Sequence, residues 1–181
     1  MKTKLTRDIE NCFIKEFTKM GLFICPEVGI NIRRFGFSKR FCKMCNNSTE
    51  QELIQKGYKQ SWHIDTEIVD ILTWESNKNI WRCYELKVSL QDFKSNASKT
   101  FVGNYNYYLI PNTLLYKVEH LIPKEIGIYV YDTNEPKYKY QSRITCYKKA
   151  KKQDLLCTEQ EIYYGMIKSL YREMKKYKNQ V

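Results

Sequence analysis

Two short apolar runs separated by a turn-like segment constrain the fold of this chain more than any other feature. Residues 68–72 (IVDIL) and 80–88 (IWRCYELKV) are rich in β-branched, aliphatic and aromatic side chains, and residues 75–79 (ESNKN) have the composition of a turn. The first run is too short for a helix and is apolar on both faces, which indicates a buried strand. The pattern therefore predicts a β-hairpin inside an α/β domain.

Three charged residues interrupt these apolar runs: Asp70 in the first, and Glu85 and Lys87 in the second. Because side chains alternate along a strand, Glu85 and Lys87 project from the same face, roughly 6–7 Å apart, and hairpin pairing can place Asp70 beside Glu85. Two buried carboxylates at close range repel each other and therefore require a cation. A hard divalent ion such as Mg²⁺ prefers oxygen ligands of this kind. With the adjacent lysine, the pair is typical of a site that hydrolyses phosphodiesters.

The sequence around these residues resembles a known family. Asp70, followed across a short hairpin by Glu85-x-Lys87, is similar to the signature of the PD-(D/E)XK nuclease superfamily. Residues 84–93 (YELKVSLQDF) resemble the E-[IL]-K-V-S-x-x-D-F segment of MmcB-like DNA-repair proteins, which form a branch of that superfamily. Val69 stands where the superfamily nominally has proline, at a position that varies widely among its members.

The resemblance extends downstream, where residues 106–111 and 122–132 are similar to the second half of the same branch. The length of the chain predicts a single domain, residues 1–181. The resemblance, which covers residues 62–132 well and the rest loosely, implies an α/β fold with a restriction-endonuclease-like core in which helices flank a mixed central β-sheet. It also implies a metal-dependent nuclease that hydrolyses DNA phosphodiester bonds in DNA repair, recombination or mobile-element biology. Two other functions stay open: a DNA-binding domain of this fold with little or no cleavage, and an RNA-processing nuclease.

Roles for the charged residues follow from the resemblance. Asp70 and Glu85 would ligate Mg²⁺ or Mn²⁺, with the backbone carbonyl of Leu86 as a third protein ligand. Lys87 would position the attacking water, help to deprotonate it and stabilise the charge that develops on the phosphorane.

Two further glutamates are candidates for an outer shell around the metal. Glu10 lies on the flank of a helix predicted over residues 4–20, and members of the superfamily often direct a first-helix glutamate into the active site. Glu27 lies in a strand predicted over residues 22–30, and MmcB-like sequences have a glutamate in a corresponding strand. The alternatives are a solvated helix acid for Glu10 and an edge-strand surface charge for Glu27.

An excess of basic residues favours nucleic acid as the partner. The chain has 31 Lys and Arg against 20 Asp and Glu, a net charge of +11, although a lysine-rich proteome would give the same excess. Residues 31–60 form an irregular basic insertion with interleaved aromatic residues, which is either a DNA contact or a solvated loop. The predicted DNA contacts are Arg33, Arg34, Lys39 and Arg40 in this insertion, and Lys94 and Lys99 in a helix over residues 89–99.

Seven cysteines and the start of the chain bear on its compartment. An odd number of cysteines without an apolar signal region argues against a disulfide framework, so we expect a cytoplasmic protein. Cys42 and Cys45 have zinc-ligand spacing, but a tetrahedral site needs two more ligands, for which Cys25 and His63 are the candidates.

The rest of the chain supplies further strands and helices. Strands are predicted over residues 105–110, 126–131 and 138–147, with a short helix over 113–118. Thr158 and Glu161 form a capping box for a final helix. That helix is predicted to pack on the domain through Ile162, Met166, Ile167, Leu170, Tyr171 and Met174.

Overall fold

The computed structural model describes six strands and the helices that precede, connect and follow them. The described part of the chain comprises residues 2–37, 39–45, 48–95, 101–134, 138 and 141–178, with the backbone alone for Lys39, Arg40, Lys43 and Tyr177. The elements in chain order are α1 (Lys4–Thr18), β1 (Phe23–Gly36), α2 (Lys39–Met44), α3 (Glu50–Gln55), β2 (Ser61–Glu75), β3 (Ile80–Leu86), α4 (Leu90–Lys94), β4 (Tyr105–Pro111), α5 (Asn112–Val118), the 3₁₀ turn η1 (Glu119–Leu121), β5 (Gly127–Tyr131), β6 (Ile144–Lys148) and α6 (Glu159–Lys178).

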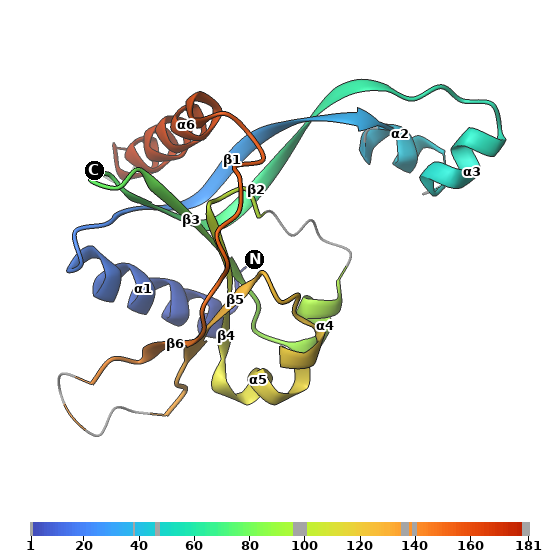
Figure 1. Ribbon diagram of the computed structural model, residues 1–181. Helices are drawn as coiled ribbons and strands as arrows, with labels where there is room; N and C mark the ends of the chain where they lie inside the picture. The colour runs from blue at the N-terminus through green and yellow to red at the C-terminus, as the bar shows by residue number, and fades with distance from the viewer. Residues whose placement is uncertain are drawn as a thin grey trace.

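The strands form one mixed sheet, in which the order in space is the order in sequence (Figure 1). β3, β4 and β5 are parallel, whereas the pairs β1–β2, β2–β3 and β5–β6 are antiparallel. Parallel neighbours need a crossover connection, and the segments that contain α4 and α5 make these two connections. The predicted single α/β domain with a mixed sheet is therefore confirmed, including the β2–β3 hairpin, whose strands end and begin at Glu75 and Ile80.

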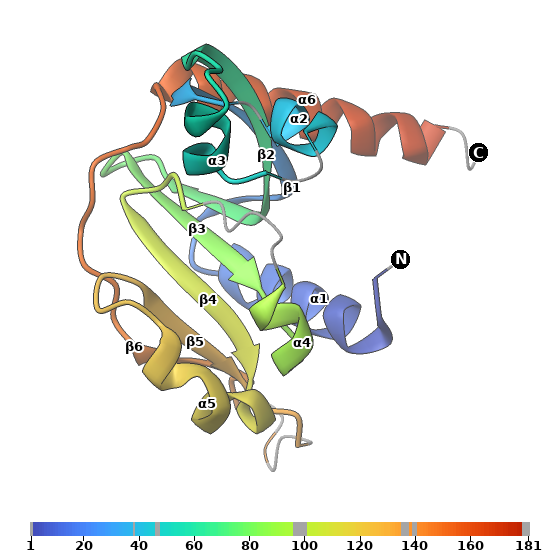
Figure 2. The same ribbon diagram turned by 90° about the vertical axis from the view of Figure 1, so that its right-hand side faces the viewer.

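Helices cover both faces of the sheet (Figures 1 and 2). On one face α1 packs against β3 to β6, and the ring centroids of Phe13 and Tyr84 lie 4.6 Å apart. On the other face α4 and α5 pack around β4 and β5, where Phe93 contacts Tyr108. Successive residues of β4 alternate between the two layers, so that Tyr107 belongs to the α1 cluster and Tyr108 to the α4–α5 cluster.

The final helix, α6, packs along β1. Ile162 and Met166 contact the buried side chains of β1, and Ser169 donates a hydrogen bond of 2.7 Å to the carbonyl of Pro26. At Gly165 the helix approaches the strand so closely that a Cβ would lie 2.6 Å from the carbonyl oxygen of Gly29. The predicted capping box is present, because the Glu161 and Thr158 side chains each accept the other residue's backbone N–H.

The predicted packing stripe of α6 is correct only in part. Residues 162, 165, 166 and 169, which are buried, follow the spacing of a single helix face. The remaining predicted members lie on the opposite side of the helix and are exposed: Ile167, Leu170, Tyr171 and Met174. The sequence pattern did not identify the buried face of α6 correctly, because both faces of the helix carry apolar side chains.

β1 and β2 extend beyond the other strands as a two-stranded arm (Figure 1). β2 pairs with β3 only from Ile71 onward, so residues 29–36 and 61–68 pair with each other alone. We call these two segments, with α2 and α3 at their end, the hairpin arm. The prediction of an irregular insertion over residues 31–60 was wrong, because β1 continues to Gly36 and two short helices follow. Charged residues interrupt the apolar pattern of both strands of the arm, among them Arg33, Arg34, Asp65 and Glu67.

Two smaller boundaries also differ from the predictions. The helix expected to reach Lys99 ends at Lys94, and Lys99 lies outside the described residues. The last strand is β6, five residues long, instead of residues 138–147. No helix in the described ranges is both long and apolar enough to cross a membrane.

Candidate functional site

The charged residues of the β2–β3 hairpin meet in a pocket at the end of β3. The pocket measures about 510 Å³, and we call it the carboxylate pocket. Its lining consists of Lys2, Thr3, Thr6, Glu10, Ile68, Asp70, Ile71, Glu85, Leu86, Lys87, Val88, Ser89 and Asp92. The three residues predicted as catalytic therefore share one pocket with Glu10, one of the two predicted outer-shell glutamates.

Strand register explains how the acidic residues come together. β2 and β3 pair at Ile71 and Tyr84, and one further step along the same register places Asp70 opposite Glu85. On the other side, Pro26 and Val28 of β1 pair with Ile71 and Val69, so Glu27 lies between the two paired positions that flank Asp70. The carboxylates of Asp70 and Glu85 therefore come together in the pocket, which is the juxtaposition that the hairpin pattern predicted.

Glu85 and Lys87 form a buried ion pair. Each residue is only 4% exposed, and the Lys87 Nζ lies 3.0 Å from the Glu85 Oε1. The other carboxylate oxygen, Oε2, is buried and has no hydrogen-bond partner among the described residues. Burial of a carboxylate oxygen without a hydrogen-bond donor destabilises the folded protein, so a cation or a donor beside this Oε2 would stabilise the site.

Asp70 and Lys87 are held by neighbouring groups. The Leu86 N–H donates a hydrogen bond of 2.8 Å to the Asp70 Oδ2. The Lys87 Nζ lies 3.5 Å from an Asp92 oxygen at the start of α4. The Ser89 Oγ caps α4 by accepting the Asp92 N–H at 3.1 Å, and the Asp92 carboxylate accepts the Val88 N–H.

The pocket opposes ionisation of its carboxylates. Burial, and secondarily the charge of Asp70, raises the pKa of Glu85 to about 7. Burial also raises the pKa of Asp70, although the Leu86 N–H works against this shift. For Lys87, burial alone would lower the pKa, but the Glu85 carboxylate outweighs it and the pKa is raised. Lys87 is therefore an ammonium at neutral pH, while both carboxylates would be stabilised by further positive charge.

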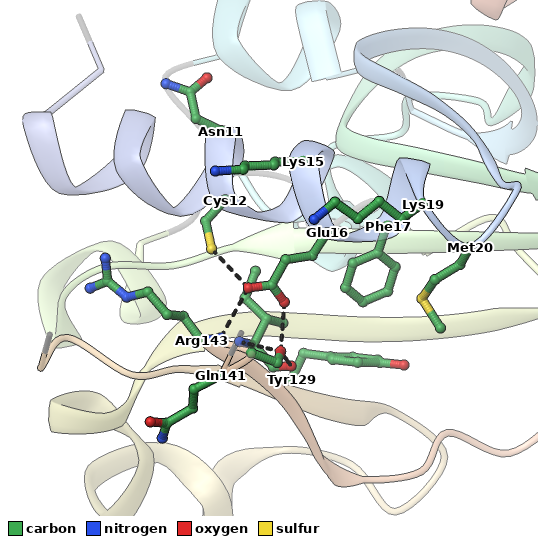
Figure 3. Close-up of a pocket in the computed structure, with 12 residues that line it drawn as sticks. Asn11, Cys12, Lys15, Glu16, Phe17, Lys19, Met20, Tyr129, Gln141 and Arg143 are labelled. Atoms are coloured by element: carbon green, nitrogen blue, oxygen red, sulfur yellow. Dashed lines mark hydrogen bonds between the residues drawn. The ribbon is translucent and has the colours of Figure 1, made fainter. Parts of the chain in front are cut away.

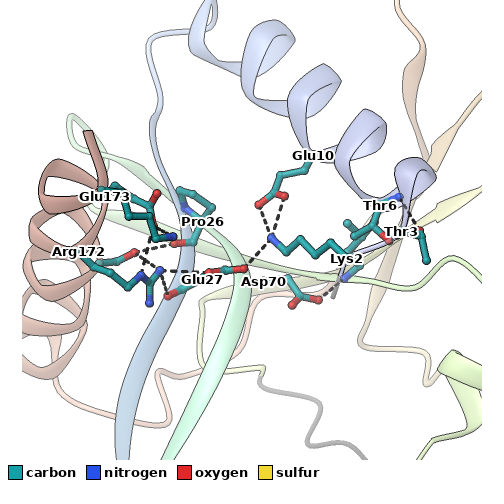
Figure 4. Close-up of polar contacts among 12 residues, drawn as sticks. Lys2, Thr3, Thr6, Glu10, Pro26, Glu27, Asp70, Arg172 and Glu173 are labelled. Atoms are coloured by element: carbon teal, nitrogen blue, oxygen red, sulfur yellow. Dashed lines mark hydrogen bonds and ion pairs between the residues drawn. The ribbon is translucent and has the colours of Figure 1, made fainter. Parts of the chain in front are cut away.

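A lysine that sequence reasoning missed, Lys2, joins the two outer-shell candidates (Figure 4). Its Nζ lies 2.8 and 2.9 Å from the two Glu10 oxygens and 2.8 Å from the Glu27 Oε1. Glu27 does not line the pocket itself, and it also contacts Arg172 of α6 at 3.4 Å. No sequence pattern links Lys2 to residues 8 and 25 positions away, because the contact depends on the tertiary fold.

The backbone of Glu27 is in an uncommon conformation. Its φ is +51°, in the left-handed region that residues other than glycine rarely adopt, at a cost of about 1 kcal/mol. Strain of this kind persists where the surroundings fix it, and it often occurs at functional sites. Here it lies directly beside Asp70 in the sheet.

The predicted nucleic-acid contacts lie mostly on the hairpin arm. Arg33 is exposed, with its guanidinium carbon 5.0 Å from the ring centroid of Trp62. Arg34 points to the other face of the arm, where it pairs with Glu67 at 2.8 Å. Lys94 is exposed on α4. Only the backbone of Lys39 and Arg40 is described, in α2, and Lys99 falls outside the described residues.

The residues considered for zinc do not come together. Cys25 is buried against α6, whereas Cys42 and Cys45 lie at the far end of the hairpin arm. His63 pairs with Asp65 at 3.3 Å. Throughout the described ranges, no group of three or more His, Cys, Asp or Glu side chains is arranged to hold a metal ion. The carboxylate pocket therefore offers a pair of acidic ligands, Asp70 and Glu85, rather than a complete side-chain cage.

A second and larger pocket, about 740 Å³, lies between α1 and β6 (Figure 3). Its central carboxylate, Glu16, accepts hydrogen bonds from the Ser142 hydroxyl at 2.6 Å, the Arg143 N–H at 2.9 Å and the Cys12 thiol. Burial opposes ionisation of Glu16, but these donors outweigh it and its pKa is lowered. Both Glu16 oxygens thus accept hydrogen bonds, and two of these bonds join α1 to the segment that leads into β6, so Glu16 has no buried oxygen without a partner like that of Glu85.

Comparison of the chain with protein-family models, with curated proteins and with solved structures gives no match. The resemblance to PD-(D/E)XK nucleases therefore stays a prediction from the sequence.

Proposed function

We propose that this protein is a metal-dependent nuclease that hydrolyses DNA phosphodiester bonds at the carboxylate pocket. The observation that carries the proposal is the buried Glu85 Oε2, which has no hydrogen-bond partner among the described residues and belongs to a carboxylate beside Asp70. A cation in contact with this oxygen would remove the cost of its burial.

The ligand chemistry fits a hard divalent ion. Mg²⁺ is commonly bound through one or two carboxylates, with waters completing its coordination, so a full cage of acidic side chains is not required. Asp70 and Glu85 would hold Mg²⁺ or Mn²⁺, with the Leu86 backbone carbonyl as the proposed third ligand. When bound, the ion would polarise the phosphoryl oxygen and lower the pKa of a coordinated water.

The protein groups around the Asp70 and Glu85 carboxylates would have separate roles. The Leu86 N–H fixes the orientation of the Asp70 carboxylate. Lys87, an ammonium that its neighbours keep charged, would donate to a phosphate oxygen and stabilise the negative charge of the transition state. Its raised pKa favours this role over that of a base that deprotonates the water. The net charge of +11 would attract the DNA backbone.

The proposal is tested by cleavage of supercoiled plasmid in Mg²⁺ or Mn²⁺ by wild type, Asp70→Asn, Glu85→Gln and Lys87→Met. We expect each substitution to slow cleavage by at least about 100-fold, because each removes a proposed ligand or a transition-state charge. Asp154→Asn, at an exposed acid outside the pocket, should cut like wild type. Thermal melting of each variant separates loss of activity from loss of fold.

The alternatives predict different results in the same assay. A DNA-binding domain of this fold would bind the plasmid but leave it intact with either ion. An RNA-processing nuclease would cut RNA of the same sequence much faster than DNA. Cleavage by Glu85→Gln at the wild-type rate would contradict the site assignment.

A further inference from the structure

We infer that the outward face of the hairpin arm binds an unpaired DNA strand by base stacking and leads it into the carboxylate pocket. This face is formed by alternate residues of the two paired strands. Its members are Gly29, Asn31, Arg33 and Phe35 of β1, and Trp62, Ile64, Thr66 and Ile68 of β2. The inference rests on the proposed function, because it names the form of DNA that the same site would receive.

Half of the eight residues on this face have large apolar side chains that are exposed. Phe35, Trp62, Ile64 and Ile68 are 57%, 62%, 65% and 59% exposed. The alternate residues on the other face include Ile30 and those that pack against α6 in the core. Contiguous exposed apolar side chains of this kind mark interaction surfaces, because a soluble protein otherwise avoids them.

The end of the arm carries an aromatic cluster suited to bases. The rings of Phe35 and Trp62 lie 5.5 Å apart between centroids, in an edge-to-face arrangement. The Arg33 guanidinium lies over the Trp62 ring, with 5.0 Å between its central carbon and the ring centroid. Exposed aromatic rings and a guanidinium plane are the groups on which unpaired bases stack.

The face runs directly to the proposed site. Ile68 belongs to both, because it also lines the carboxylate pocket, and Asp70 is the next residue of the same alternating series. From Trp62 to Asp70 there are eight residue steps, or about 27 Å at the rise of an antiparallel strand. A single strand of several nucleotides could therefore stack at the end of the arm while its backbone reaches the pocket.

Charge distinguishes an unpaired strand from a duplex. Arg33 is the one cationic side chain on this face of the paired strands, whereas Arg34 lies on the other face and pairs with Glu67. A duplex presents its phosphates to a protein and keeps its base faces stacked internally, so recognition of a duplex here would require more basic residues. An unpaired strand presents the base faces that apolar and aromatic groups can contact.

The test measures binding of a fluorescent single-stranded oligonucleotide, and of a blunt duplex of the same sequence, by anisotropy in EDTA, where cleavage is suppressed. We expect Trp62→Ala to weaken single-strand affinity by about 5- to 100-fold, the range for loss of one base–aromatic stack, and to change duplex affinity little. Trp62→Phe should restore most of the affinity. Tyr116→Ala, which removes an 80% exposed aromatic side chain from α5, should bind like wild type.

Unchanged single-strand affinity in Trp62→Ala would overturn the inference, as would an equal loss for single strand and duplex. The readout needs no metal and no cleavage, so it is independent of the nuclease proposal. If Glu85→Gln cut DNA like wild type while Trp62→Ala lost single-strand binding, the site assignment would fail and the binding face would stand. The reverse pattern would retain the active site and reject the binding face.

Discussion

Glu85 lies beside a lysine and is nevertheless disfavoured as an anion. One of its oxygens contacts the Lys87 ammonium at 3.0 Å, while the other is buried without a hydrogen-bond partner in the described structure. Burial and the nearby Asp70 outweigh the attraction of the lysine, and the pKa of Glu85 rises to about 7. The residue thus has one positive partner and needs a second, which is the physical basis for proposing a metal ligand here.

Because the folded state raises the pKa of Glu85, protonation at this site should stabilise the metal-free protein. The contribution is present at pH values below the unfolded pKa near 4.5, and it is lost as pH rises through about 7. Relative to Glu85→Gln, the wild-type free energy of unfolding in EDTA should fall by about 3 kcal/mol between pH 4.5 and pH 8. Thermal or urea unfolding of both proteins across this range measures the difference, and parallel pH profiles would contradict it.

The Lys2 side chain places a positive charge beside the proposed metal site. Its ammonium contacts Glu10 and Glu27, and its charge also acts on Asp70. Lys2→Ala should leave the pocket more negative and tighten Mn²⁺ binding about fivefold, which corresponds to about 1 kcal/mol from one partly screened charge. Lys4→Ala removes the same charge from an exposed position outside the pocket and should change the affinity little. Weaker Mn²⁺ binding in Lys2→Ala would show that this lysine instead organises the site.

At the scale of elements, strand ends and strand register position the chemistry. Antiparallel pairing of β2 with β3 brings Asp70 and Glu85 together, and α4 begins just beyond Lys87 with its own cap. α1, α5 and α6 support this arrangement by packing on the sheet. α6 contributes through Gly165, which fits against the backbone of β1.

Gly165→Ala should destabilise the protein, although alanine is the better helix former. Its Cβ would lie 2.6 Å from the carbonyl oxygen of Gly29, so α6 or β1 has to shift. We expect a loss of about 1–3 kcal/mol, or a melting temperature lower by several degrees. Gln160→Ala, on the exposed side of the same helix, provides the control. A higher melting temperature in Gly165→Ala would mean that the helix is not in such close contact with the strand.

Short local patterns were sufficient to predict the centre of the sheet. The turn at residues 75–79 and the apolar runs around it predicted the hairpin that joins Asp70 to Glu85, and the capping box of Thr158 and Glu161 predicted the start of α6. The hairpin arm could not be predicted in the same way, because one face of a two-stranded ribbon stays exposed and its apolar pattern is interrupted by charge. Lys2 was missed since its ion pairs join distant segments of the chain.

The molecule as a whole is positively charged, whereas the carboxylate pocket is rich in acidic residues. Its net charge is +11, which attracts a polyanion over long range, whereas the carboxylate pocket gathers Glu10, Asp70, Glu85 and Asp92 around two lysines. A DNA phosphate would be repelled by these carboxylates unless a cation neutralised them. The proposed metal would therefore serve substrate binding as well as chemistry.

The most direct test of this account is calorimetric titration of Mn²⁺ into the wild-type protein and into Glu85→Gln at pH 8. At that pH Glu85 is mainly ionised, and its buried carboxylate requires a positive partner beyond Lys87. We predict a saturable site with one Mn²⁺ per chain in the wild type, and at least about tenfold weaker binding in the variant. The absence of saturable binding to the folded wild type, or equal affinity in both proteins, would contradict the claim that this pocket is a metal site.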